Sequence, residues 1–153
     1  MTGMTRIRGR GFTMVELLVV LAIAGALLTV APTALHRYRD SAQYRDALRT
    51  MTAQLSEARQ TAISGGRVVA FRVDLDARQF GVDGRPARDL PDGLSVRATV
   101  ADTDLVGGVA SIRFFPGGNA TGGSIELIRA SGAGARLRAD WLDGRVTIEP
   151  LSP

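Results

Sequence analysis

An acidic side chain, Glu16, lies near the start of a long apolar stretch. It is the one ionisable residue between Met14 and Leu35. A carboxylate in a membrane or in a packed helix bundle is costly unless a positive group compensates it. The chemistry indicated for Glu16 is therefore ion pairing, and its position predicts a functional role.

The rest of the chain offers few groups for catalysis. Cysteine and lysine are absent, which excludes a cysteine nucleophile, a disulfide framework and a P-loop lysine. The single histidine, His36, follows the apolar stretch, and we interpret it as a solvated residue rather than a general base. One histidine forms no zinc-binding cluster. We therefore expect no enzymatic activity, no metal and no cofactor.

Two pairs of aspartates have a spacing that suits oxygen ligands. Asp74 and Asp76 are separated by one residue, as are Asp102 and Asp104, so either pair could hold calcium. Local hydrogen bonding within turns is the interpretation that we favour, because aspartate is common there. Whether a pair binds calcium stays open on the sequence.

The basic residues give limited support for nucleic-acid binding. All 19 are arginines, and Arg6, Arg8 and Arg10 precede the apolar stretch, which leaves 16 arginines against 15 acids. Arg136 and Arg138 alternate along a predicted strand, but phosphate binding usually needs several clustered cations. We interpret this pair as part of a solvated strand face and expect no nucleic-acid partner.

The first element that must position Glu16 is a helix. About twenty mainly apolar residues follow the basic segment 1–11, which is enough to cross a bilayer. Because that segment has arginines and no acid, the positive-inside rule places it in the cytoplasm. A removed secretory signal and a plain membrane anchor are alternatives. The stretch is longer than a signal's apolar region, and a plain anchor leaves Glu16 unexplained.

A second helical pattern follows Pro32, a residue that would bend the helix without necessarily ending it. Apolar residues then recur every three or four positions, up to the helix stop expected at Gly65-Gly66. They are Tyr44, Leu48, Met51, Leu55, Ala58 and Ala62. This stripe predicts a helical face that is buried, with Arg59 on another face.

Beyond Gly66 the pattern changes to that of strands. We predict strands at 67–73, 79–82, 94–100, 111–115, 124–129, 136–142 and 145–149. Asp143-Gly144 is a strong hairpin signal between the last two. One long helix followed only by strands predicts an α+β fold, with an antiparallel sheet packed on the helix. Trp141, Phe114 and Phe115 are expected in the core.

The residues around Glu16 carry a family resemblance. Gly11-Phe12-Thr13-Met14-Val15-Glu16, directly before the apolar stretch, resembles the prepilin cleavage motif of type IV pilins and type II secretion pseudopilins. In that family a membrane aspartyl peptidase cuts after the glycine and methylates the new amino terminus. The resemblance implies cleavage between Gly11 and Phe12, N-methylation of Phe12, and pairing of Glu16 with the terminal amine of a neighbouring subunit.

Later segments resemble the soluble domain of the general secretion pathway protein H family. They are Leu55–Ile63, Phe71–Asp74, Ile112–Gly118, Gly122-Gly123 and Asp143–Val146. The resemblance implies a pilin-like fold in four parts. These are a prepilin leader at 1–11, a transmembrane and assembly helix at 12–35, the periplasmic half of the helix at 36–65, and a β-rich pseudopilin domain at 66–153.

The function implied by this resemblance is structural. We expect a minor pseudopilin near the tip of a type II secretion pseudopilus, anchored in the bacterial inner membrane with its domain in the periplasm. Its partners would be other minor pseudopilins, the major pseudopilin and the prepilin peptidase, in a machine that exports folded proteins across the outer membrane. The alternative is a FimT-type minor type IV pilin, acting in pilus priming or DNA uptake.

Overall fold

The computed structural model describes residues 12–152, apart from the side chains of 27–39 and 102. Gly11, the predicted residue before the cleavage point, lies outside this part. The chain forms two compact units, with the boundary between Arg39 and Asp40. One helix, α1 (Met14–Gly65), contributes to both units and continues through Pro32, as the sequence predicted.

The membrane span was predicted at 12–35. Among the side chains that the structure describes, no helix is both long and apolar enough to cross a membrane. The predicted span extends into residues 27–35, whose side chains lie outside the described ones.

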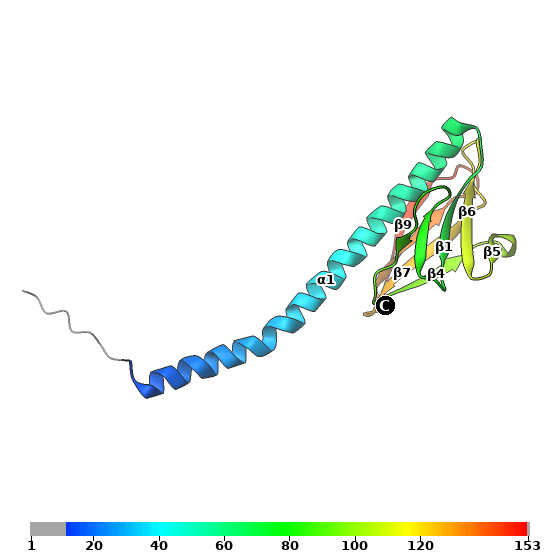
Figure 1. Cartoon of the computed structure of the whole chain (residues 1–153). Helices are drawn as coiled ribbons and strands as arrows, with labels where there is room; N and C mark the ends of the chain where they lie inside the picture. Colours follow the sequence, from blue (N-terminus) through cyan, green and yellow to red (C-terminus); the bar gives the residue numbers. More distant parts are fainter. Residues whose placement is uncertain (1–11, 153) are drawn as a thin grey trace, which may run out of the picture. The chain divides into compact units, whose positions relative to one another are not determined.

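In the second unit, nine described strands follow α1 and form two antiparallel sheets (Figure 1). The first sheet has the order β3-β2-β1-β6-β5, and the second has the order β4-β7-β8-β9. The strands of the first sheet are β1 (Val69–Asp74), β2 (Gln79–Val82), β3 (Arg88–Asp89), β5 (Leu105–Val106) and β6 (Val109–Phe114). Those of the second are β4 (Leu94–Thr99), β7 (Gly123–Arg129), β8 (Gly134–Ala139) and β9 (Val146–Leu151). A short 3-10 helix, η1 (Asp102–Asp104), precedes β5.

A single hydrophobic core joins the helix to both sheets. The predicted helical stripe faces this core, with Met51 and Leu55 completely buried. Phe71 and Phe114 enter it from the first sheet, and Leu137 enters it from the second. The predicted α+β fold, a long helix packed on antiparallel strands, is therefore confirmed.

Seven strands were predicted and nine are described. The two that were missed are β3 and β5, each two residues long, and among the predicted strands the main difference lies after Ala139. The strand predicted at 136–142 ends at Ala139, because the chain turns at Asp140. Trp141 therefore lies on a turn and is 67% exposed, so its predicted place in the core was wrong. Phe114 is buried as predicted, and Phe115 is half-buried.

Candidate functional site

The first candidate site is the beginning of α1. The Leu17 N–H donates to the Thr13 carbonyl oxygen at 3.2 Å, and the Glu16 N–H donates to the Thr13 hydroxyl oxygen at 3.2 Å. Thr13 therefore caps the helix, with Glu16 in its first turn. Threonine followed three residues later by glutamate has the spacing of a capping box, a signal that the sequence analysis missed.

The side chains of Phe12 and Glu16 are both exposed. A carboxylate in the first turn interacts favourably with the positive end of the helix dipole. Glu16 has no ion-pair partner in the part of the chain that the structure describes.

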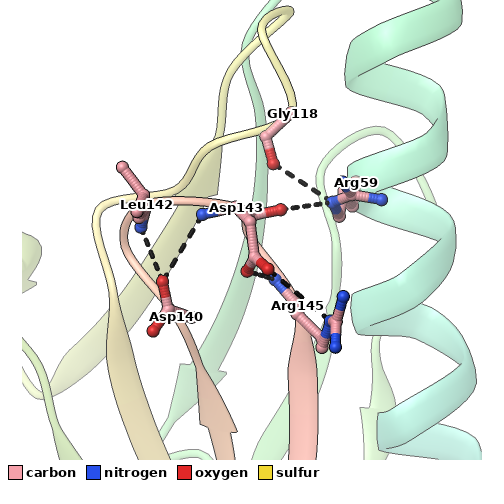
Figure 2. Close-up of polar contacts among 6 residues, drawn as sticks. All are labelled: Arg59, Gly118, Asp140, Leu142, Asp143 and Arg145. Atoms are coloured by element: carbon pink, nitrogen blue, oxygen red, sulfur yellow. Dashed lines mark hydrogen bonds and ion pairs between the residues drawn. The ribbon is translucent and has the colours of Figure 1, made fainter.

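The second candidate site lies where α1 meets two loops of the β-rich unit. The Arg59 Nε–H donates to the carbonyl oxygens of Gly118 and Asp143, at 3.1 and 3.0 Å (Figure 2). These acceptors belong to the loop after β6 and to the turn between β8 and β9. One guanidinium thus fastens two distant loops to the helix, although the sequence placed Arg59 on an unburied face.

The turn between β8 and β9 is closed by its own hydrogen bonds. Asp140 Oδ1 accepts from the backbone N–H of Leu142 at 2.8 Å and from that of Asp143 at 3.4 Å (Figure 2). The Gly144 N–H donates to the Asp140 carbonyl at 3.0 Å. Gly144 has a φ of +63°, and a Cβ added there would collide with the Gly118 carbonyl oxygen. Glycine is thus required where the turn approaches its neighbouring loop.

Next to this turn, the outer face of the second sheet carries the arginines predicted as a pair. Arg136 contacts Glu126 at 2.7 Å and Glu149 at 3.5 Å, one on each neighbouring strand. The hydrogen bond to Glu126, and then that residue's negative charge, raise the pKa of Arg136. Arg138, by contrast, is exposed and has no ion-pair or hydrogen-bond partner within the described residues. The two arginines therefore do not form one basic patch.

One aspartate of each pair is engaged by the protein itself. Asp74 Oδ1 accepts from the backbone N–H groups of Asp76 and Ala77, at 3.0 and 2.7 Å, which confirms the predicted turn role. Asp104 is buried and forms an ion pair with Arg113 at 2.7 Å. Across the described residues, no group of three or more histidine, aspartate or glutamate side chains is arranged to hold a metal ion. The side chains of His36 and Asp102 lie outside that part.

Comparison with protein families gives two matches. The family described as type II transport protein GspH matches residues 47–143. The prokaryotic N-terminal methylation motif matches residues 6–32, a range that includes the predicted cleavage point and Glu16. Type II secretion system protein H of Xanthomonas campestris pv. campestris is 34% identical over 145 residues, covering 93% of this chain and 84% of that protein.

Two solved structures share the fold. The minor pseudopilin EpsH from the type 2 secretion system of Vibrio cholerae gives a TM-score of 0.57 at 13% identity, covering 71% of this chain and 97% of EpsH. The type IV minor pilin FimU of Pseudomonas aeruginosa gives a TM-score of 0.55 at 16% identity, covering 74% of this chain and 92% of FimU. One relative belongs to a secretion system and the other to a pilus, so the fold is common to both machines.

Proposed function

Because this chain belongs to the type II transport protein GspH family, we propose that it assembles as a minor subunit of a type II secretion pseudopilus. The observation that carries this proposal is the match to that family over 47–143, together with 34% identity to a type II secretion protein H along almost the whole chain. The fold alone is shared with a pilus protein, so it supports the class of subunit and not the machine.

The proposed maturation begins with cleavage between Gly11 and Phe12, followed by N-methylation of Phe12. The match to the N-terminal methylation motif over residues 6–32 supports this step. Phe12, the residue after the proposed cleavage point, is exposed and precedes α1, which begins at Met14. The mature chain would retain the apolar half of α1, which would anchor it in the inner membrane with the β-rich unit in the periplasm.

The proposed assembly step uses Glu16. Its carboxylate would pair with the terminal amine of a neighbouring subunit when the apolar helices pack together. In a low-dielectric bundle, each charge is costly unless the other is present. The capping-box spacing of Thr13 and Glu16 offers a second role for the Glu16 side chain, which would be to stabilise the start of its own helix.

Two substitutions at Glu16 separate these roles. Glutamine can replace glutamate in a capping box but carries no charge, whereas alanine removes both functions. We expect Glu16→Gln and Glu16→Ala to be processed normally and to impair secretion equally at native expression. Normal secretion by Glu16→Gln, with a defect in Glu16→Ala, would assign the residue to capping and refute the charge pairing.

Intact mass of the protein from its native membrane tests the maturation step. We expect a chain that begins at methylated Phe12, and a Gly11→Ala variant that keeps its leader. A leader retained on the unaltered chain, in cells with active prepilin peptidase, would refute the proposed processing.

Deleting the gene and restoring it tests whether the subunit serves a secretion pseudopilus or a type IV pilus. We expect loss of secretion of folded proteins, with twitching and DNA uptake intact. The reverse pattern would favour the FimT-type minor pilin. The proposed role near the tip, alongside other minor pseudopilins and the major one, also requires that the subunit be present in few copies per filament.

A further inference from the structure

The turn between β8 and β9 presents two apolar side chains to solvent. Trp141 and Leu142 are each 67% exposed, although the turn that carries them is fixed by hydrogen bonds to Asp140 and Arg59. Tryptophan contributes disproportionately to protein interfaces, and a rigid carrier lowers the entropy lost on binding. The fold itself gives no reason for an exposed tryptophan at this place.

A pocket adjoins Trp141 on the outer face of the second sheet. It has a volume of about 390 Å³, and its lining includes Thr99, Ser124, Arg136, Arg138, Asp140 and Trp141. We call it the Trp141 pocket.

The polar groups of the Trp141 pocket suit a single anion. The strand register places Arg138, which has no partner among the described residues, opposite Ser124 of β7, and both residues line the pocket. The neighbouring Arg136 is already compensated by two glutamates. The Asp140 carboxylate also lines the pocket, but it already accepts from the backbone N–H groups of Leu142 and Asp143. Among the described residues, the pocket therefore offers the Arg138 guanidinium without a partner, with the hydroxyl groups of Thr99 and Ser124, beside an indole ring. A carboxylate next to an apolar group has the matching chemistry.

We propose that the Trp141 pocket receives an acidic side chain, accompanied by an apolar one, from a neighbouring subunit of the pseudopilus. The carboxylate pairs with Arg138, and the apolar group packs on Trp141 and Leu142. This inference rests on the proposed function, because it takes the partner from the same filament. A protein partner is favoured over nucleic acid. Among the described residues of the pocket only Arg138 is a cation without a partner, which is few for phosphate binding, while arginine beside tryptophan is typical of protein interfaces.

The place of the turn within its unit supports a partner stacked beyond it. Helix α1 enters this unit at Asp40 and ends at Gly65. The turn is attached near that far end, through Arg59 (Figure 2). A subunit beyond the end of the unit remote from Asp40 would thus meet Trp141 and Leu142.

The absence of cysteine from the chain allows a direct test. A full-length Leu142→Cys variant replaces the natural protein in the native bacterium, is labelled with a benzophenone maleimide and is irradiated. We expect a cross-linked product that mass spectrometry identifies as another pseudopilin. Val106→Cys is the matched control, because Val106 is 71% exposed but lies on the first sheet. It should give little of that product.

A charge reversal then tests the chemistry of the pocket. In the Leu142→Cys background, Arg138→Glu should lower the yield of the product about tenfold, as expected for loss of an interface hot spot. Arg67→Glu makes the same charge change at another exposed arginine and should leave the yield unchanged. Arg138→Gln keeps a polar side chain and should lower the yield less than Arg138→Glu.

Three results would overturn this inference while leaving the proposed function intact. The first is the lack of a pseudopilin product at Leu142→Cys in cells that process the chain and secrete normally. The second is a yield that Arg138→Glu does not change. The third is a short DNA duplex bound by the purified full chain in detergent, with binding lost in Arg138→Glu, which would favour nucleic acid. Failure of the unaltered chain to be processed or to support secretion would instead refute the proposed function.

Discussion

Replacing Arg59 by methionine should loosen the turn that carries Trp141. The substitution keeps most of the apolar stem but removes the N–H that donates to the Gly118 and Asp143 carbonyls. Because one N–H is shared between two acceptors, we count one charged hydrogen bond, with a net value of about 1.5–3 kcal/mol. Arg59 is half-buried, so water can partly replace the lost N–H donor at the two carbonyls. We therefore expect a loss of stability at the lower end of this range, about 1.5 kcal/mol. The melting temperature should fall by roughly 5 °C.

The single tryptophan of the chain makes the local effect measurable. In the full-length protein in detergent, the fluorescence anisotropy of Trp141 should be lower in Arg59→Met than in the natural sequence, because the turn gains mobility. Arg67→Met is the control, since Arg67 is exposed and unpaired within the described residues; it should change stability by less than about 0.5 kcal/mol. If both variants melt at the same temperature and give the same anisotropy, Arg59 does not hold the turn.

Two further substitutions test the packing around this turn and in the core, both by urea unfolding. Gly144→Ala should lower the free energy of unfolding by about 2 kcal/mol more than Gly84→Ala does. Both glycines have positive φ, but only at Gly144 would the new Cβ strike the Gly118 carbonyl oxygen. Equal losses of stability would mean that backbone strain alone matters. Leu55→Ala should lower the free energy of unfolding by about 3 kcal/mol, since Leu55 is completely buried, whereas the exposed Ser56→Ala should cost less than about 0.5 kcal/mol. Similar small losses at both positions would contradict the predicted burial of this helical face.

The sequence by itself was enough to locate the long helix, most of the strands and the N-terminal motif of this protein. A stripe that includes Met51 and Leu55 has helical spacing, so it marks the buried face of α1 without any knowledge of its partner. Strand patterns and glycine turns likewise located most strands to within two or three residues. The prepilin-like motif at Gly11 to Glu16 could also be recognised, because its residues are adjacent in the chain. These features depend on local spacing, which a single sequence records directly.

Only the tertiary structure decided which distant residues meet. Arg59 bonds to carbonyls that are 59 and 84 residues away, and Arg136 is compensated by glutamates from two other strands. The division of the strands into two sheets and the outward position of Trp141 were also not predicted from the sequence. Strand order and register arise from packing over the whole domain, and backbone carbonyls leave no signature in residue types. For the same reason, only the folded chain shows that the exposed Trp141 and Arg138, which has no partner among the described residues, line one pocket.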